Sequence, residues 1–221
     1  PLNDSQKSAV AAAVAGFGHR GDFGAPPFTL IHGPPGTGKT QTITAIVSTY
    51  LGMVSRYRSK DRRVLVMAPS NTAVDEVILR LTGAVEGLTV VRMGVRHSVD
   101  PEVLRRKLFL EDQINVLVGE SVDEATGERV CLNLMPRGQA RAQVISGADV
   151  IFSTIGSAKY FPVDFPFVIV DEAAQTTEPQ VLQPLTFNCR RCVLVGDPKQ
   201  LRPVVISQAA QRGGFDRSLM Q

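Results

Sequence analysis

Apolar residues gather in five short runs along this chain, and no run alternates apolar with polar positions. The runs cover residues 28–31, 64–67, 150–152, 167–170 and 192–195. A strand that faces water on one side alternates, whereas a strand covered by helices on both faces is apolar throughout. The five runs therefore predict a buried, mostly parallel sheet.

Helical patterns lie between these runs. Residues 73–81 have apolar positions at helical spacing, and 5–15 is an Ala-rich stretch that Asn3, Asp4 or Ser5 could cap. A further helix is expected from about Lys39, and 16–27 is a Gly- and Pro-rich loop. Strand, helix and strand in repetition predict a doubly wound α/β domain.

The segment 98–147 breaks this rhythm because it contains no clear core strand. Leucine and isoleucine residues at helical spacing are followed by a polar turn at 123–127 and by a second helical stretch that ends near Val144. The spaced residues are Leu104 with Leu108, and Leu110 with Ile114 and Leu117. The sequence therefore predicts a mainly helical insertion at 98–147, within a core domain formed by 1–97 and 148–221.

Composition narrows the class of protein. Hydrophobic residues make up 43% and charged residues 20%, which is typical of a folded domain. No apolar stretch reaches the roughly 18 residues that a membrane-spanning helix needs. The net charge of +3 permits a polyanionic partner without demonstrating one. Because the chain starts at Pro1 without a secretory signal, we interpret its start as a boundary inside a longer protein.

Three cysteines, Cys131, Cys189 and Cys192, cannot all form disulfides with one another. This count fits a reducing intracellular compartment, the nucleus or the cytoplasm. Cys192 opens an apolar run, so a small buried residue is the favoured interpretation over a metal ligand, which would need about four partners.

A phosphate-binding pattern follows the first apolar run. Its residues are Gly33, Pro34, Pro35, Gly36, Thr37, Gly38, Lys39 and Thr40, matching Gly-x-x-x-x-Gly-Lys-Thr. Glycines let backbone N–H groups converge on phosphate oxygens, and a helix N-terminus adds positive potential. Lys39 is expected to reach the β- and γ-phosphates of ATP, and the Thr40 hydroxyl to hold Mg²⁺. The alternative is a Gly- and Pro-rich turn with a chance Lys-Thr pair.

An acidic pair follows the fourth run. A Mg²⁺ ion on nucleotide phosphates needs an acidic holder at the end of a neighbouring buried strand. We expect Asp171 to be that carboxylate, acting through water, and Glu172 to be the base that activates the attacking water. An acidic helix N-cap is the alternative reading of the pair.

Several stretches resemble motifs of superfamily 1 helicases. Asp171-Glu172-Ala173-Ala174-Gln175 and Gly196-Asp197-Pro198-Lys199-Gln200-Leu201 resemble motifs II and III, Ala68 to Asp75 resembles motif Ia, and the stretch around Gln6 is similar to the Q motif. The combination is most similar to the 5′-to-3′ branch, superfamily 1B, with the nonsense-mediated-decay RNA helicase, senataxin and the immunoglobulin-mu-binding helicase. The resemblance spans about 2–219, is weakest across the insertion, and implies a RecA-like P-loop NTPase fold.

The resemblance also implies roles for individual residues. Gln6 would bind the adenine edge, and Gln200 would sense the γ-phosphate. Donors to the backbone phosphates of a single strand would be Ser70, Asn71, Thr72 and Thr154. Asn71 and Thr72 could instead merely cap the next helix. The chain departs from the family at Arg202, where proline is common.

The implied function is that of the ATP-binding domain of an ATP-dependent 5′-to-3′ RNA/DNA helicase. It would hydrolyse ATP with Mg²⁺ to translocate on single-stranded RNA or DNA, as a monomer without membrane contact. A second RecA-like domain, C-terminal in the same polypeptide, would supply arginines for phosphoryl transfer. The alternatives are a catalytically inactive nucleic-acid-binding or scaffolding module derived from a helicase, and a P-loop ATPase not coupled to translocation.

Two basic stretches leave a choice open. Residues 56–63 carry five basic side chains, and Arg105, Arg106 and Lys107 lie on the insertion. Each stretch is either a solvated surface or a nucleic-acid contact.

Overall fold

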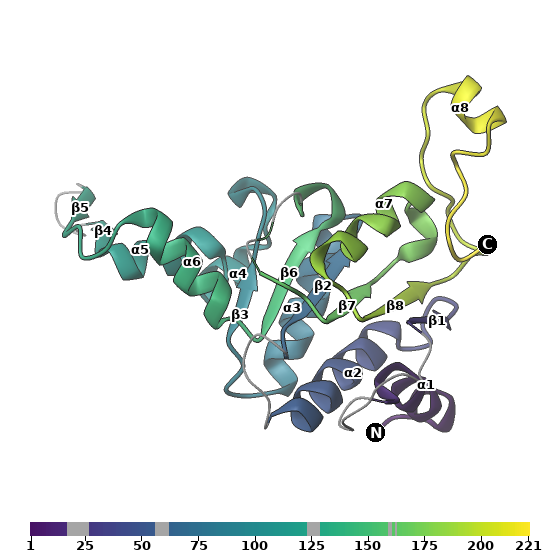
Figure 1. Ribbon diagram of the computed structural model, residues 1–221, viewed down its shortest axis with the longest axis horizontal. Coiled ribbons are helices and arrows are strands. Elements are labelled where there is room, and N and C mark those ends of the chain that lie inside the picture. Colours follow the sequence, from purple (N-terminus) through teal and green to yellow (C-terminus); the bar gives the residue numbers. More distant parts are fainter. Residues whose placement is uncertain (17–26, 56–61, 123–128, 159–160, 162) are drawn as a thin grey trace.

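A six-stranded parallel sheet forms the centre of the computed structural model, which describes residues 1–16, 27–55, 62–122, 129–158, 161 and 163–221. The strands lie in the order β1-β8-β7-β2-β6-β3, and every pair is parallel (Figure 1). Their bounds are β1 Phe28–His32, β2 Val64–Ala68, β3 Val90–Arg92, β6 Val150–Thr154, β7 Phe167–Val170 and β8 Arg191–Gly196. The parallel sheet predicted from the apolar runs is confirmed.

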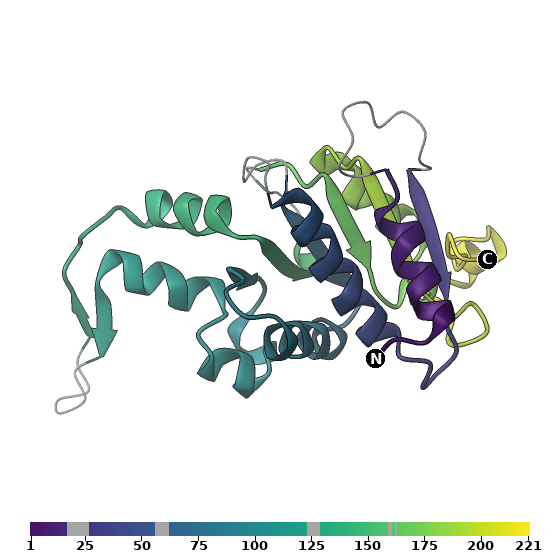
Figure 2. The ribbon, with the colours of Figure 1, turned by 90° about the horizontal axis from the view of Figure 1, so that it is seen from below.

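Helices cover both faces of this sheet. Figure 2 shows one face covered by α1 (Asp4–Val14), α2 (Lys39–Val54) and α3 (Asn71–Ala84). Apolar residues of α5 (Leu110–Val118), α6 (Arg137–Gly147) and α7 (Glu178–Leu182) pack with the residues of the opposite face. Helix α4 (Pro101–Arg105) packs near α3, and α8 (Gln208–Arg212) lies near the C-terminus. None of the described helices is both long enough and apolar enough to cross a membrane.

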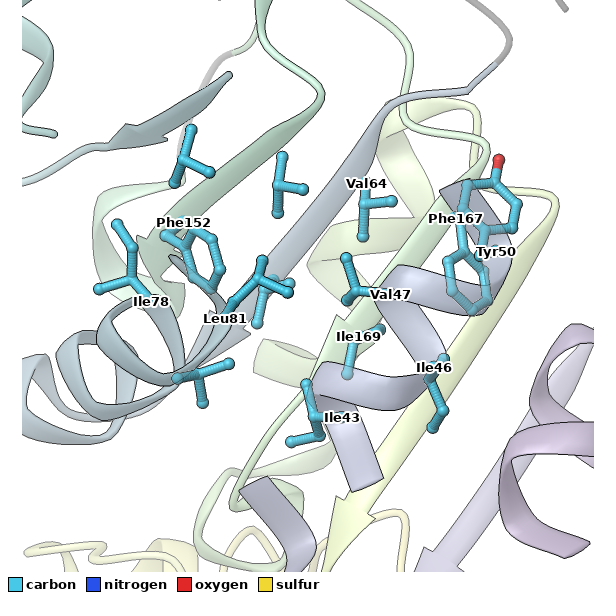
Figure 3. Packing of buried hydrophobic residues seen from close by; sticks show 14 of the residues in the cluster. Ile43, Ile46, Val47, Tyr50, Val64, Ile78, Leu81, Phe152, Phe167 and Ile169 are labelled. Atoms are coloured by element: carbon cyan, nitrogen blue, oxygen red, sulfur yellow. The ribbon is translucent and has the colours of Figure 1, made fainter. Parts of the chain in front are cut away.

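The core divides into two apolar clusters because successive strand residues point to opposite faces. On β2, Val64 and Val66 pack with the α1–α3 face, whereas Leu65 and Met67 pack with the other cluster. Figure 3 shows Ile43, Val47 and neighbouring residues of α2 lying over β2 and β7. Tyr50 stacks on Phe167 with ring centroids 4.4 Å apart.

The edge strands differ from the sequence-based prediction. In β1 exposed and partly buried residues alternate, and Leu30 is 58% exposed, so this run is not covered on both faces. The opposite edge strand, β3, was not predicted. It has only three residues and ends in the charged Arg92, so it lacks a recognisable apolar run.

The segment 98–147 is mainly helical, as expected, but it also contains a β-hairpin. Strands β4 (Glu120–Val122) and β5 (Arg129–Cys131) pair antiparallel between α5 and α6, and this arm extends away from the central sheet (Figures 1 and 2). The predicted Leu104–Leu108 helical pair is wrong, because α4 ends at Arg105 and Lys107 has a left-handed φ of 54°. The polar turn at 123–127 and most of the loop at 16–27 lie outside the described residues.

Candidate nucleotide site and nucleic-acid interface

The predicted phosphate loop connects β1 to α2 at the carboxyl edge of the sheet. Gly36 and Gly38 have φ of 76° and 79°, a left-handed backbone that glycine adopts without strain. A Cβ on Gly33 would lie 2.8 Å from Thr37 Oγ1 and 2.9 Å from Lys39 Cγ. The loop therefore curls so closely around the start of α2 that larger side chains would fill it.

The loop is held by its own hydrogen bonds and leaves the helix start open. The Thr37 hydroxyl donates to the Pro34 carbonyl at 2.7 Å, and the Gly33 N–H donates to the Gly196 carbonyl at 3.1 Å. The N-cap of α2 is Gly38, which supplies no side-chain acceptor. The first N–H groups of this 16-residue helix thus have no capping side chain, an arrangement suited to an anion such as a nucleotide phosphate.

The acidic pair meets the phosphate loop. Lys39 Nζ lies 3.7 Å from Glu172 Oε1, and both side chains are mostly buried. The expectation that β7 directly neighbours β1 is wrong, because β8 lies between them in the sheet. The long Lys39 side chain nevertheless brings its charge to the end of β7.

Asp171 is a buried carboxylate at the end of β7. Its side chain ends β7, is only 5% exposed, and accepts the Glu172 N–H at 2.9 Å. Burial raises the pKa of Asp171 to about 6; that hydrogen bond and the Lys39 charge oppose the rise, while the Glu172 and Glu76 charges add to it. A divalent cation would offset this cost of charge burial.

The donor set at this place fits Mg²⁺. The Thr40 hydroxyl and the Asp171 carboxylate are oxygen ligands, which Mg²⁺ prefers, and Mg²⁺ commonly uses one or two protein ligands together with phosphates and water. Among the described residues no group of three or more His, Cys, Asp and Glu side chains could hold a metal ion by itself. The chemistry of these two groups is compatible with Mg²⁺, and their role as its ligands stays a prediction.

Glu172 adopts a backbone conformation that is rare for its residue type. Its φ of 49° and ψ of 38° are left-handed, a state that costs on the order of 1 kcal/mol and concentrates at functional sites. The carboxylate makes no capping hydrogen bond to the 3₁₀ turn Ala173–Gln175, and instead accepts from Gln175 Nε2 at 3.2 Å. This geometry does not support the alternative that the acidic pair is merely a helix cap.

Gln200 belongs to a hydrogen-bonded group after β8. Its Nε2 donates to Asp197 Oδ2 at 3.0 Å, and the Lys199 N–H donates to Asp197 Oδ1 at 3.0 Å. His32 Nε2, at the end of β1, lies 2.9 Å from the same Oδ1. Gln200 first, then Lys199 and His32, lower the pKa of Asp197 to about 2. His32 and Asp197 were not predicted as site residues, although both stand at strand ends.

Gln6 contacts the phosphate loop directly. Its Nε2 donates to the Thr37 carbonyl at 3.0 Å, while its Oε1 accepts the Asn3 N–H at 2.9 Å in the capping box of α1. Both ends of the amide are thus used within the protein. The expected contact with adenine stays a prediction.

The four predicted nucleic-acid residues lie at the ends of β2 and β6, where Ala68 pairs with Thr154. Ser70 is the N-cap of α3 and accepts the Ala73 N–H at 3.1 Å, so Asn71 and Thr72 are not the caps. Thr72 is exposed, and Thr154 is buried. The Thr154 hydroxyl donates to Ser157 Oγ at 2.8 Å, so its proton is already engaged. Contact of these residues with a strand stays a prediction.

Two further residues reach these sites and were missed. The Thr40 hydroxyl donates to Glu76 Oε1 of α3 at 3.3 Å, and Arg92 Nη2 donates to Asn71 Oδ1 at 2.9 Å. Neither residue was marked out by a motif or by local spacing. Their positions depend on which helix and which strand end pack together.

The basic stretches are largely engaged within the protein where they are described. Arg105 and Arg106 both pair with Glu102 at 2.6 Å, and Arg62 pairs with Asp149 at 2.9 Å. Arg63 is buried and donates to the Ser146 carbonyl. Residues 56–61 lie outside the described residues.

Of the cysteines, Cys192 is buried within an apolar cluster, as expected. Its hydrogen bond with Cys189 and its burial both raise the pKa of the Cys192 thiol, which makes it less reactive.

Comparison with known proteins identifies the family. The chain matches the AAA domain family model over residues 1–130 and 120–208. It is 32% identical over 235 residues to the Neurospora crassa "Regulator of nonsense transcripts 1 homolog", and the match covers 100% of this chain and 20% of that protein. It is 30% identical over 299 residues to human "Probable helicase senataxin", covering 99% of this chain and 11% of that protein.

A third relative and a solved structure agree with this placement. The Schizosaccharomyces pombe "ATP-dependent helicase upf1" is 32% identical, with 100% of this chain and 24% of that protein covered. The chain thus spans less than a quarter of the length of these curated relatives. The crystal structure of T4 UvsW superposes with a TM-score of 0.52 at 11% identity, over 87% of this chain and 29% of that chain, which shows the shared fold. The chain belongs to the AAA domain family and is a RecA-like domain of the superfamily 1 helicase type, similar to the nonsense-mediated-decay helicase and senataxin.

Proposed function

We propose that this chain is the ATP-binding domain of an ATP-dependent 5′-to-3′ RNA/DNA helicase, which hydrolyses ATP to translocate on single-stranded nucleic acid. The observation that carries this proposal is the 3.7 Å approach of Lys39 to Glu172. This approach joins the phosphate loop to the acidic pair at one edge of the sheet. Relatives named as helicases support the same reading.

The roles of the nucleotide-site residues follow from their positions. The loop Gly33–Thr40 would hold the phosphates through backbone N–H groups, with Lys39 offsetting their charge. Thr40 and Asp171 would hold Mg²⁺, which supplies charge neutralisation at the phosphates when bound. Glu172, held by Lys39 and Gln175, would orient and deprotonate the attacking water.

Other roles rest on the family resemblance together with location. Gln6, at the phosphate loop, would contact adenine, and Gln200 would respond to the γ-phosphate by leaving its bond to Asp197. Single-strand phosphates would be bound at the ends of β2 and β6 by Ser70, Asn71, Thr72 and Thr154.

The wider assembly is also part of the proposal. Residues 1–97 and 148–221 would form the ATP-binding core and 98–147 an accessory insertion. A second RecA-like domain in the same polypeptide would close over the nucleotide, in a monomeric protein of the nucleus or cytoplasm. By itself the chain would bind Mg·ATP weakly and hydrolyse it slowly.

A fluorescent-nucleotide titration tests the nucleotide site. We expect binding that requires Mg²⁺ and is abolished by Lys39→Ala, while Lys7→Ala on exposed α1 serves as the matched control and leaves binding unchanged. A nucleotide affinity that changes neither on removal of Mg²⁺ nor in Lys39→Ala would refute the proposal.

Hydrolysis tests the coupling to nucleic acid. In the longer polypeptide that carries the second domain, single-stranded RNA or DNA should stimulate hydrolysis, and Glu172→Gln should reduce it by at least about a hundredfold. Strand binding indifferent to ATP and to Glu172→Gln would point to an inactive scaffold. Hydrolysis that no strand stimulates would point to an uncoupled ATPase.

A further inference from the structure

A charged pair is buried beside the proposed strand-binding residues. Arg92, the last residue of β3, is 0% exposed, and Asp75 of α3 is 4% exposed. Arg92 Nε donates to Asp75 Oδ1 at 2.6 Å. Burial of two charges is unfavourable unless they are paired and hydrogen-bonded, so this pair needs all of its partners.

Each side-chain nitrogen of Arg92 and each carboxylate oxygen of Asp75 has a hydrogen-bond partner. Arg92 Nη1 donates to the Met93 carbonyl, and Arg92 Nη2 donates to Asn71 Oδ1 at 2.9 Å. The second oxygen of Asp75 accepts the Asp100 N–H at 2.8 Å, at the start of α4. The pair therefore links β3, α3 and the beginning of the insertion to Asn71.

The chemistry of arginine fixes which way the Asn71 amide is turned. A guanidinium has only donors, so the Asn71 atom that faces it must be the carbonyl oxygen. The NH₂ group, at the other end of the planar amide, then faces away from Arg92. Asn71 is partly exposed and is the first residue of α3, next to Ser70 and Thr72.

We propose that Arg92 and Asp75 are positioning residues that hold Asn71 as a hydrogen-bond donor toward a backbone phosphate of single-stranded nucleic acid. The inference rests on the proposed function, since it takes Asn71 as a strand contact. Arg92 acts through Asn71 and does not itself touch the strand. The pair thus converts a side chain with two possible orientations into one with a fixed donor.

A double-mutant cycle tests this coupling in the chain as it stands. Asn71→Ala is made in the wild type and in an Arg92→Met/Asp75→Leu background, which replaces the pair with apolar side chains and is often neutral for stability. Affinity for a fluorescent single-stranded RNA is measured by anisotropy. We expect Asn71→Ala to weaken binding about tenfold in the wild type and less than about twofold in the other background. Equal losses in both backgrounds overturn the proposal.

Salt dependence separates positioning from direct contact. Because Asn71 is uncharged and Arg92 is buried, the slope of log affinity against log salt should stay the same in all variants. If Arg92 itself bound a phosphate, its removal would lower the slope by about one. Such a fall overturns the positioning role.

A second variant tests the amide orientation without disturbing the pair. Asn71→Asp keeps an oxygen toward Arg92 but places another oxygen where the NH₂ group was, so it should bind the strand more weakly than Asn71→Ala. Affinity equal to or above that of Asn71→Ala overturns the assigned orientation, and the test holds even where the Arg92→Met/Asp75→Leu variant fails to fold.

Nucleotide titration of the same samples separates this inference from the proposed function. Loss of Mg²⁺-dependent nucleotide binding in the wild type is a failure of the proposed function. Normal nucleotide binding together with a strand affinity unchanged by Asn71→Ala overturns the inference alone, whereas a complete lack of strand binding counts against the proposed function as well.

Discussion

Replacing Asp171 with asparagine should stabilise the ligand-free chain at neutral pH. The folded chain holds this carboxyl at a pKa of about 6, against an ordinary value of 3.8. A difference of about 2 corresponds to about 3 kcal/mol, because each pKa unit is worth about 1.36 kcal/mol. Asparagine keeps an oxygen that can accept the Glu172 N–H, and it carries no charge to bury. The attraction between Asp171 and Lys39 is already contained in this pKa, so it is not subtracted a second time.

The pH dependence gives the sign of this effect. The folded-state pKa lies above the unfolded one, so between about pH 4 and pH 6 the folded chain binds more protons at Asp171. The stability that the protonated group contributes is fully present below about pH 4 and is lost as the pH rises through about 6. The advantage of Asp171→Asn over wild type should therefore be near zero at low pH and reach its full value at about pH 7.

Urea unfolding with a metal chelator, at several values between about pH 4 and pH 8, measures this difference. Asp164→Asn, at an exposed carboxylate, is the matched control and should change the free energy of unfolding by less than about 0.5 kcal/mol. Equal stability of Asp171→Asn and wild type at pH 7, or a gain that does not vary with pH, would refute the reasoning. A stabilised variant that no longer binds Mg²⁺ with nucleotide would show that stability is sacrificed for the ion.

Four other substitutions have outcomes that the structure sets, each measured by urea unfolding, with a nucleotide titration added for Gly38→Ala. Gly38→Ala should lower the free energy of unfolding by about 1–2 kcal/mol and weaken nucleotide binding, since φ is 79° and a Cβ would lie 2.6 Å from a side-chain nitrogen. Gly52→Ala, in an open position of α2, should raise the free energy of unfolding by about 0.5–1 kcal/mol. If Gly38→Ala and Gly52→Ala changed the free energy of unfolding equally, the argument from backbone strain at Gly38 would be contradicted. Ser70→Ala removes the acceptor of the Ala73 N–H and should cost about 1 kcal/mol, and no loss would show that water replaces the cap. Arg92→Met alone leaves a buried carboxylate unpaired and should cost about 3–5 kcal/mol, so a loss below about 1 kcal/mol would show that the charge is solvated.

The strands show what a local pattern can and cannot predict. The runs that became β2, β6, β7 and β8 are buried at every residue, so an unbroken apolar run was a reliable sign of a covered strand. The same sign failed for β1, because only the strand order decides that Leu30 lies on an edge strand. Strand β3 was missed because the partner that lets Arg92 be buried lies on α3.

Some residues of the candidate site could likewise be predicted from the sequence, and others could not. The phosphate loop could be predicted because backbone groups can converge on an anion only with glycines at fixed positions, and these leave a signature in the sequence. Asp171 and Glu172 could be predicted because they end an apolar run. Glu76 and His32 could not be predicted as site residues. Glu76 on α3 and His32 at the end of β1 reach the site only because of the way in which these elements pack together.

The pairing of the first strand with the last has a consequence for biosynthesis. Among the described strands of the central sheet, β1 pairs with β8 and with no other, so that Phe28 is opposite Cys192 and His32 is opposite Gly196. Pairing over such a separation must close a very large loop, which makes it entropically costly and late. A ribosome therefore exposes the phosphate loop long before β8 emerges, and the proposed nucleotide binding would be acquired only after Gly196, whose carbonyl accepts the Gly33 N–H, has been synthesised.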